Sequence, residues 1–530
     1  MTASGTQPGS VVFELADFRN CPLIDFTRDE NNQKMKEALA GVRERLGREY
    51  PIVIGGETKY CETKFQSFNP ARKDEVVGVF QQSTPELLDQ AIASAVETYQ
   101  RWSREPVKER VRAVLRISQL IKERRLELAA WMTIEVGKPW AEADADVAEA
   151  IDFCEYYARQ MLQLAEPAPL PPIEDEDPEL RYIPLGVGAV IPPWNFPLAI
   201  LTGMTIASIV AGNTVVLKPS SDSPTIAAQF FRILEEAELP NGVVQFVTGS
   251  GSEIGDPLVA DPRIRFIAFT GSREVGTRIY ERAARVQPGQ IWLKRVIAEM
   301  GGKNAVIVDE DCDLDEAVSG VIVSAFGYQG QKCSAGSRAI VLEPVYDLFI
   351  ERLLERIPEL VRAGDLDSAD VNFGPVINRR AHESILRYIE TGRSEGRLVT
   401  GGKAGDPAGY FIDPTVFVDV DPKAIIAQEE IFGPVLSVIG ARDFSEALQI
   451  ANGTQYGLTG ALYSRNEARI RRAKDEFHVG NLYINRKCTG ALVGVHPFGG
   501  FNMSGTDSKA GGPDYLLLFT QAKSISRKKK

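Results

Sequence analysis

Cys333 has the surroundings in the sequence that most favour chemistry. It lies in the segment GQKCSAGS (residues 330–337), where small residues on both sides let the backbone approach a substrate carbonyl closely. A cysteine thiolate can attack such a carbonyl, and the backbone N–H of the same cysteine can help to hold the resulting oxyanion. A single cysteine is more often a small buried apolar residue, so the prediction depends on partner groups elsewhere in the chain.

Two polar side chains far from Cys333 in the sequence have the types that such a nucleophile needs. Asn195 follows a predicted strand in IPPWNFP (191–197), where its amide can donate a hydrogen bond at the carboxyl end of a sheet. Glu299 lies in IAEMGGKN (297–304), and a desolvated carboxylate with a raised pKa could take a proton from water and so release an acyl group. Alone, the asparagine would suit a turn and the glutamate a helix cap or the surface. Together with the cysteine, they predict one catalytic site.

Two glycine-rich turns indicate a site for a phosphate-bearing cofactor. They are TGSGSEIG (248–255) and FTGSREVG (269–276), and each follows a predicted strand and opens a predicted helix. Backbone amides at a helix N-terminus bind phosphate, although the first turn has one residue too many for the GxGxxG fingerprint. Lys218 ends a predicted strand where a ribose hydroxyl or phosphate could be reached, and Glu430 could accept hydrogen bonds from ribose hydroxyls.

Composition excludes several classes of function. The formal net charge of -12 argues against a nucleic-acid-binding surface, because phosphate neutralisation needs clustered Lys and Arg. The basic run 527–530 is predicted to be a solvated end. No stretch reaches the roughly 18 to 20 apolar residues of a membrane span, and 198–210 is predicted to be a buried helix. The six cysteines contain no CxxC pair, so they predict neither a disulfide framework nor a zinc site, and a cytoplasmic location fits both them and the absence of a leader.

The elements that must position these residues alternate in type along the chain. Residues 27–50 and 84–166 show the periodicity of helices, and a Pro-rich acidic passage follows at 167–178. Short apolar runs then alternate with helical segments, and the last thirty residues resemble a strand or arm. The predicted strands are 188–191, 214–217, 243–247, 264–269, 305–308, 339–342, 416–418, 435–440 and 460–463. This alternation predicts an α/β fold with parallel sheets in two domains.

Seven segments, in order, closely resemble the aldehyde dehydrogenase superfamily: PWNFP, LKPS, FTGS, EMGGKN, GQKCSAGS, EEIFGP and PFGG. The resemblance covers roughly residues 50–530. It implies an N-terminal helical arm (1–50), an NAD-binding Rossmann-like domain (51–166 and 183–298), a catalytic α/β domain (299–503) and a small oligomerisation arm (167–182 and 504–530).

The resemblance also implies roles for individual residues. Cys333 would be the nucleophile, Asn195 and the Cys333 N–H the oxyanion hole, and Glu299 the base that hydrolyses a thioester. Lys218 and Glu430 would bind the two ribose groups of NAD. Ser272 would bind the pyrophosphate and Phe432 would pack near the nicotinamide ribose. The full predicted cofactor set is Ile191, Pro193, Trp194, Lys218, Ser220, Ser221, Gly251, Gly255, Thr270, Gly271, Ser272, Gly276, Met300, Gly301, Glu430 and Phe432. Ser221 is small where an acid would repel a 2′-phosphate, so NADP could be tolerated.

Within the superfamily the chain is most similar to the L-glutamate γ-semialdehyde (1-pyrroline-5-carboxylate) dehydrogenase branch. The similarity lies in 135–146, 151–158, 488–500 and 504–513. An α-carboxylate needs backbone amides and a hydroxyl as donors, and a sandwich of two rings would hold the aliphatic stem. The predicted substrate residues are Phe196, Ser334, Gly490, Ala491 and Phe498. No residue is assigned to the substrate ammonium group, and no metal is predicted.

The resulting hypothesis is NAD-dependent oxidation of L-glutamate γ-semialdehyde to glutamate, the second step of proline degradation. Alternatives are action on another semialdehyde such as the succinic one, a CoA-acylating dehydrogenase, or a catalytically silent binding protein on the same fold. Glu299 argues against CoA acylation, because water rather than CoA would need a base. Expected partners are a small aldehyde, further copies of the chain in a dimer or an assembly of dimers, and a separate proline dehydrogenase.

Overall fold

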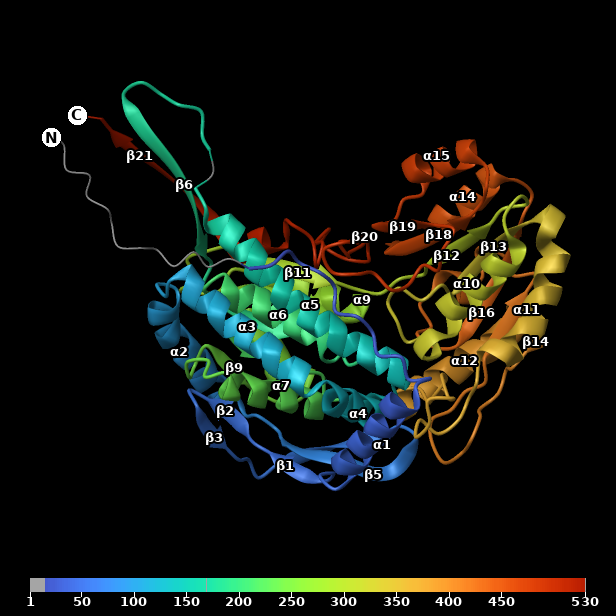
Figure 1. Cartoon of the computed structure of the whole chain (residues 1–530), viewed down its shortest axis with the longest axis horizontal. Helices are drawn as coiled ribbons and strands as arrows, with labels where there is room; N and C mark the ends of the chain where they lie inside the picture. Colours follow the sequence, from blue (N-terminus) through green and yellow to red (C-terminus); the bar gives the residue numbers. More distant parts are fainter. Residues whose placement is uncertain (1–14, 168, 530) are drawn as a thin grey trace.

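Two seven-stranded sheets organise the chain, one in each of two α/β lobes (Figure 1). The structure is a computed structural model that describes residues 15–167 and 169–529. The first sheet has the order β11-β10-β7-β8-β9-β2-β3. Its strands are β2 (Ile52–Ile54), β3 (Glu57–Lys59), β7 (Val187–Ile191), β8 (Thr214–Leu217), β9 (Val244–Phe246), β10 (Ile264–Thr270) and β11 (Arg295–Glu299). Neighbours are parallel from β11 to β9, while β2 and β3 are antiparallel additions.

The second sheet has the order β14-β15-β16-β13-β12-β18-β19. Its strands are β12 (Ala305–Val308), β13 (Arg338–Leu342), β14 (Arg397–Thr400), β15 (Thr415–Val418), β16 (Val435–Ala441), β18 (Thr459–Tyr463) and β19 (Asn481–Ile484). All neighbours are parallel except β14, which joins the edge antiparallel to β15. The predicted α/β fold with two parallel sheets is therefore confirmed.

Continuous apolar runs explain why these segments form parallel strands. Every residue of β8, β12 and β13 is buried, as expected where helices cover both faces of a sheet. The first-lobe helices are α1 (Asp29–Arg43), α2 (Pro85–Trp102), α3 (Val107–Glu123), α4 (Arg125–Val136), α5 (Trp140–Ala165), α6 (Ala199–Val210), α7 (Pro224–Glu236), α8 (Asp256–Ala260) and α9 (Arg273–Ala284). The second-lobe helices are α10 (Leu314–Phe326), α11 (Tyr346–Leu360), α12 (Arg379–Glu395), α13 (Ile425–Gln428), α14 (Phe444–Asn452) and α15 (Glu467–Glu476). Short irregular helices are η1 (Gly251–Gly255), η2 (Gly327–Gly330), η3 (Glu343–Val345) and η4 (Tyr515–Phe519).

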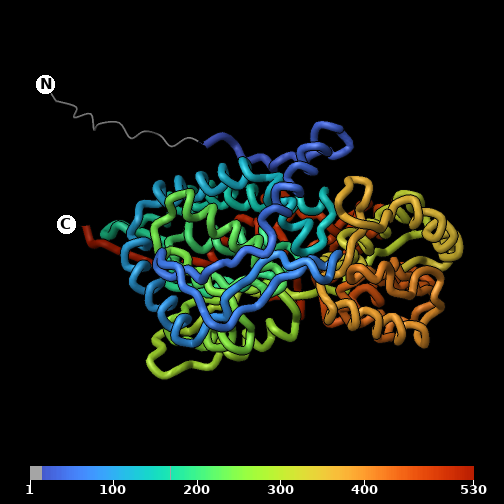
Figure 2. The backbone as a smooth tube through the Cα atoms, turned by 90° about the horizontal axis from the view of Figure 1, so that it is seen from below, coloured from blue at the N-terminus to red at the C-terminus, as the bar shows by residue number. Residues whose placement is uncertain are grey.

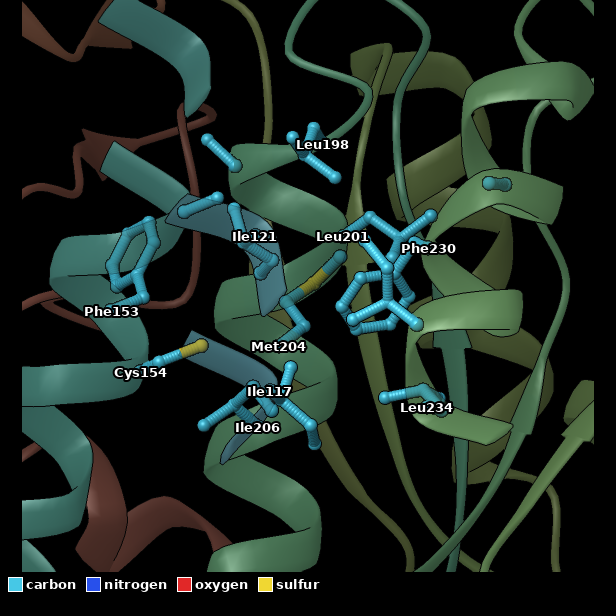
Figure 3. Packing of buried hydrophobic residues seen from close by; sticks show 14 of the residues in the cluster. Ile117, Ile121, Phe153, Cys154, Leu198, Leu201, Met204, Ile206, Phe230 and Leu234 are labelled. Carbon is cyan, nitrogen blue, oxygen red and sulfur yellow. The ribbon is translucent and has the colours of Figure 1, made fainter. Parts of the chain in front are cut away.

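The core of the first lobe lies where α3, α5, α6 and α7 meet. Figure 3 shows Phe153 of α5 and Met204 of α6 among its apolar side chains, with Ile117 and Phe230 from the flanking helices. α6 is buried along almost its whole length, so the predicted buried helix at 198–210 is confirmed. Replacing Leu201 by Ala would cost roughly 2–5 kcal/mol of stability. This core fixes the helices that carry cavity residues.

Smaller sheets lie outside the two lobes. β1 (Arg48–Tyr50), β5 (Arg72–Gln81) and β4 (Lys64–Asn69) form one of them, and Figure 2 shows this part of the chain spread across one face of the first lobe. β17 (Tyr456–Gly457) and β20 (Phe501–Asn502) form a short pair. β6 (Glu176–Pro184) and β21 (Thr520–Lys528) pair antiparallel into a ribbon that projects from the body (Figure 1). The predicted terminal strand is therefore present.

One predicted helical region is shorter in the structure, and the other is divided into several helices. Residues 27–50 form a helix only over α1, because Gly47, with φ +72°, turns the chain into β1. Residues 84–166 form four helices, α2 to α5, with breaks before Val107, at Arg124 and at Gly137–Pro139. Pro106 and Pro139 precede two of the helices, since proline lacks the N–H that an interior helical position needs. Positions 1–14 of the predicted N-terminal arm lie outside the described residues.

The two segments of the predicted oligomerisation arm contain both a projecting ribbon and a part that packs on the body. Residues 504–519 pack against the body, where Gly505 forms a bridge with Glu299, and only the last part enters the ribbon. Arg527 and Lys528 of the basic run are exposed, in agreement with the predicted solvated end, while their backbone forms the outermost pairs of that ribbon. Ala168 and Lys530 lie outside the described residues. Among the residues described, no helix combines the length and apolarity needed to cross a membrane.

Candidate active site

The carboxyl ends of the parallel strands bring the predicted site residues to one edge of the first sheet. Ile191 ends β7, Thr270 ends β10 and Glu299 ends β11, while Lys218 directly follows β8. The register pairs Thr270 with Glu299 directly. In parallel sheets with helices on both faces, ligands bind at this edge.

The two glycine-rich turns lie at helix starts, as predicted. The first forms η1, which leads directly into α8, and the second places Ser272 as the N-cap of α9. The Ser272 Oγ accepts a hydrogen bond from the Val275 N–H at 3.3 Å. A Cβ at Gly276 would lie 2.3 Å from the Met300 Sδ, so a larger residue would require the Met300 side chain to move.

Lys218 is a buried cation with little hydrogen bonding of its own. Its Nζ donates to the Pro219 carbonyl at 3.2 Å, and burial lowers its pKa to about 8. Its stem lies beside Gly255, where an added Cβ would be 3.8 Å from the Lys218 Cε. Ser220 and Ser221 follow it, with the Ser221 Oγ 3.5 Å from the Gly249 carbonyl. A hydroxyl-rich anionic ligand at the edge of this sheet would satisfy the ammonium group.

Glu430 and Phe432 reach this edge from the second lobe. The Glu430 Oε1 accepts a hydrogen bond from the Gly302 N–H at 2.9 Å, and burial raises the Glu430 pKa to about 7. A Cβ at Gly301 would lie 2.0 Å from the Glu430 Oε2, so a larger residue there would displace the Glu430 carboxylate. Phe432, at φ +56°, meets Trp194 edge to face with ring centroids 5.5 Å apart. The predicted cofactor residues of both lobes therefore lie around one edge, and their donors and acceptors fit a dinucleotide.

A network of backbone and amide contacts holds the Cys333 loop. The Asn304 Nδ2 donates to the carbonyls of Cys333 and Ala335 at 2.7 and 2.8 Å, and its Oδ1 accepts from the Thr459 N–H at 2.9 Å. The Gln329 amide donates to two further carbonyls. Asn304 is not among the predicted site residues, although this asparagine belongs to the EMGGKN segment. Its function is to hold the loop in place, and this became evident only from the spatial contacts.

Cys333 and Glu299 interact directly. Burial raises the pKa of the Cys333 thiol well above its ordinary value, and the neighbouring Glu299 carboxylate raises it further. Burial also raises the pKa of Glu299 to about 8. A hydrogen bond with Cys333 acts in the opposite direction, but its effect on the pKa is smaller. The Glu299 Oε1 is buried without a hydrogen-bond partner in the part of the chain that the structure describes. This arrangement can hold and release a proton next to a sulfur nucleophile.

Asn195 contacts the same loop. It is buried, and its Nδ2 donates to the carbonyl of Gln331, two residues before Cys333, at 3.1 Å. A side-chain amide has two N–H donors, so one remains for a ligand. No hydrogen bond of the Cys333 backbone N–H is recorded among the described residues. Two donors are therefore free near the sulfur.

One cavity of about 110 Å³ joins the reacting residues with the predicted substrate residues. Segments of both lobes line it, and Glu299 and Cys333 are among them. All five predicted substrate residues contribute to its wall: Phe196, Ser334, Gly490, Ala491 and Phe498. No cluster of His, Cys, Asp or Glu suited to a metal ion occurs among the described residues.

Three acidic groups near this cavity are not among the residues predicted from the sequence. Glu149 lines it directly. Glu142 holds Lys332, the neighbour of the nucleophile, with both oxygens 2.7 Å from the Lys332 Nζ. A third acid, Asp146, pairs with Lys138, whose Nζ lies 3.8 Å from the centroid of the Phe196 ring. The available signal was an acidic residue at helical spacing within the otherwise buried face of α5.

Comparison with known proteins agrees with this geometry. The model of the aldehyde dehydrogenase family matches residues 57–525, and the chain belongs to that family. The 1-pyrroline-5-carboxylate dehydrogenase of Geobacillus thermodenitrificans is 56% identical over 509 residues, covering 96% of this chain and 99% of that protein. The 1-pyrroline-5-carboxylate dehydrogenase 2 of Bacillus subtilis shows the same identity and coverage. The structure of 1-pyrroline-5-carboxylate dehydrogenase from Thermus with bound NAD matches with a TM-score of 0.95 and 50% identity, covering 97% of this chain and 99% of that chain.

Proposed function

We propose that this protein oxidises L-glutamate γ-semialdehyde, the open-chain form of 1-pyrroline-5-carboxylate, to L-glutamate with NAD as the oxidant. The observation that carries the proposal is one cavity, which joins a cysteine nucleophile and a partly buried base to a wall that includes two phenylalanines and the Gly490–Ala491 loop. The identity to 1-pyrroline-5-carboxylate dehydrogenases over 96% of the chain supports the same substrate.

The reaction begins at sulfur. Glu299 accepts the Cys333 proton, and the thiolate adds to the aldehyde carbon to form a tetrahedral thiohemiacetal anion. The Asn195 amide and the Cys333 N–H, which have free donors, stabilise the oxyanion. Bound NAD supplies the hydride acceptor. Glu299 passes the cysteine proton to solvent and, as a carboxylate again, takes a proton from water. The resulting hydroxide adds to the thioester carbon and expels the thiolate, which Glu299 reprotonates as the acid is released.

The cavity wall would select the substrate by the groups at the end opposite the aldehyde. Backbone N–H groups at Gly490 and Ala491, with the Ser334 hydroxyl, would bind the α-carboxylate. Phe196 and Phe498 would hold the aliphatic stem between them. Lys138 fixes Phe196 from outside the cavity through its contact with the face of that ring.

NAD would lie along the carboxyl edge of the first sheet. Lys218 and Glu430 would bind the ribose hydroxyls, Ser272 with the N-terminus of α9 the pyrophosphate, and Phe432 would pack against the nicotinamide ribose. The remaining predicted cofactor residues are neighbours of these groups at the same strand ends. Ser221 leaves room for a 2′-phosphate, which would allow NADP as a weaker substitute.

Assembly and location follow from other features. The ribbon of β6 and β21 projects from the body with unpaired strand edges, which supports a homo-oligomer in which the ribbon contacts another copy. The six cysteines are free, as suits a reducing cytoplasm. A separate proline dehydrogenase would supply the substrate.

The experiment that tests this function is NADH formation from 1-pyrroline-5-carboxylate, with succinic semialdehyde and a simple aldehyde as comparison substrates. We expect the highest kcat/KM with the first, and loss of NADH formation in the Cys333→Ala variant because no thiohemiacetal can form. A higher kcat/KM for succinic semialdehyde would contradict the proposed substrate assignment. Full activity of the Cys333→Ala variant would contradict the proposed nucleophilic role of Cys333.

A further inference from the structure

The turn that follows β19 has two consecutive backbone N–H groups at the cavity wall. Gly490 and Ala491 both line the cavity, and no hydrogen bond of either N–H is recorded among the described residues. Gly490 has φ +78°, a backbone conformation that residues with a side chain rarely adopt. Successive N–H groups at such a left-handed turn form a concavity that binds anions. The turn therefore offers two donors to a carboxylate.

Arg486 holds the opposite side of this turn. Its Nη2 donates to the Thr489 carbonyl at 2.8 Å and to the Gly490 carbonyl at 3.1 Å. In a planar trans peptide the carbonyl and the following N–H point in opposite directions, and no cis peptide occurs among the described residues. Since Arg486 holds both carbonyls, the N–H groups of Gly490 and Ala491 point away from its guanidinium group on one common side.

The charge of Arg486 is not neutralised by an acid. No ion pair of Arg486 is recorded in the part of the chain that the structure describes, and its Cζ lies 4.3 Å from the centroid of the Tyr483 ring. Stacking on an aromatic face orients a planar guanidinium group and leaves its charge in place. The positive charge therefore acts on the two peptide groups, and it polarises their N–H donors toward an anion on the other side.

Cys488 connects the same turn to the loop of the nucleophile. Its Sγ donates to the Ser334 carbonyl at 3.3 Å, and its N–H donates to the Ser324 Oγ at 3.2 Å. Ser334 directly follows Cys333 in the sequence, and both residues line the cavity. The turn and the sulfur are therefore held relative to one another as two ends of one site.

We propose that Arg486 is a positioning residue that holds the carbonyls of Thr489 and Gly490, so that the two N–H groups of the turn face the cavity and select aldehydes with a carboxylate at the far end. This inference rests on the proposed function and deepens it. Arg486 is not among the residues that line the cavity, so it acts on the substrate through the two peptide groups.

The test compares two aldehydes that differ only at the end opposite the aldehyde. 5-Oxopentanoate carries a carboxylate there, whereas pentanal carries a methyl group on the same chain length. In the Arg486→Ala holoenzyme we expect the ratio of kcat/KM for 5-oxopentanoate over pentanal to fall roughly 10-fold or more, mainly through KM for 5-oxopentanoate, because oriented hydrogen bonds to the carboxylate are lost. The value of kcat/KM for pentanal should stay within about twofold of the wild type.

A second variant keeps the test decisive if Arg486→Ala does not fold. Arg486→Gln retains part of the side chain but lacks the charge and the reach to hold both carbonyls, so we expect the same ratio to fall in this variant too. A ratio unchanged from the wild type in either folded variant would overturn the inference. An equal loss of kcat/KM for both aldehydes would also overturn it, because that result indicates a general disturbance of the site.

Arg393 of α12 provides a matched control. Its Nη2 donates to the Gly402 carbonyl at 2.8 Å, and Gly402 also has a left-handed conformation, with φ +80°, but neither residue lines the cavity. Arg393→Ala should leave the ratio within about twofold of the wild type.

The two proposals fail in different ways. A wild-type enzyme that forms no NADH from 1-pyrroline-5-carboxylate and shows no preference for 5-oxopentanoate over pentanal contradicts the proposed function. A wild-type preference that survives in folded Arg486→Ala contradicts only the role of Arg486.

Discussion

Glu299 at the carboxyl end of β11 and Glu135, which reaches the N-terminus of α7 from α4, differ in how the acid is satisfied. At α7, Glu135 accepts hydrogen bonds from the Ser67 hydroxyl and from the N–H groups of Thr225 and Ile226, at 2.9, 2.7 and 2.8 Å. At β11, the Glu299 Oε1 has no partner in the described part of the chain. Burial raises the pKa of Glu135 to about 7 and of Glu299 to about 8.

The difference shows that burial and a raised pKa do not by themselves mark a catalytic acid. Glu135 caps a helix whose own N-cap, Ser223, provides no side-chain hydrogen bond, so its lone pairs are used for stability. Glu299 leaves a lone pair directed to a cavity that also contains a thiol. A free acceptor facing a ligand cavity is therefore the better sign of function.

The largest expected effect is the loss of turnover when Glu299 is replaced by Gln. We expect kcat to fall roughly 10²- to 10⁴-fold, because a positioned base is removed from thioester hydrolysis. If a proton acceptor other than Glu299 serves the thiol, rapid-mixing measurements should still show a burst of NADH near one per site, since hydride leaves before the hydrolytic step. Loss of the burst would mean that Glu299 is already needed when the thiol is deprotonated, and unchanged kcat would remove its catalytic role.

The matching change at the other site should act on stability. Glu135→Ala leaves the two N–H groups at the start of α7 and the Ser67 hydroxyl without their acceptor, so we expect the free energy of unfolding to fall by about 2–4 kcal/mol. Urea unfolding would measure it. The folded variant should turn over at the wild-type rate, and a kcat loss comparable to that of Glu299→Gln would erase the contrast between the two acids.

The pH dependence of turnover should follow Glu299 and not Glu135. A base works in its ionised form, and the ionised fraction of a group with a pKa of about 8 increases as the pH rises through that value. Where hydrolysis limits the rate, kcat should therefore decrease about tenfold per pH unit below 8. Glu135→Gln should leave this profile in place. A kcat profile with its midpoint near the ordinary pKa of glutamate would show that the site does not raise the pKa of Glu299 in solution.

The smallest expected effect is a gain in stability in the Glu299→Gln variant. Because burial raises the pKa of this acid in the folded state, the folded protein binds more protons than the unfolded one between about pH 5 and 8, so ionisation lowers stability as the pH rises. Glutamine removes that effect, and we expect a gain of about 1 kcal/mol at pH 8 that shrinks toward pH 5. Thermal melts at the two pH values would measure it, and a loss at pH 8 would contradict it.

Local sequence determined much of the molecule. The largely apolar runs at 214–217 and 305–308 match their strands, because a strand covered by helices on both faces consists mostly of apolar residues. Helix boundaries were less accurate, as Gly47 and Pro106 show. The types and order of Cys333, Asn195 and Glu299 indicated their chemistry through a family resemblance, which spacing alone could not have provided.

Only the tertiary structure decided which groups face one another. Glu135 and Glu149 lie on consecutive helices and have the same side chain, yet one caps α7 and the other lines the cavity. Nothing in the local sequence distinguishes them, since the partners of Glu135 are 68 to 91 residues away in the chain. The physical reason is that a carboxylate's role depends on which donors and which solvent surround it, and those are assembled when α4, α5 and α7 pack together with the two sheets.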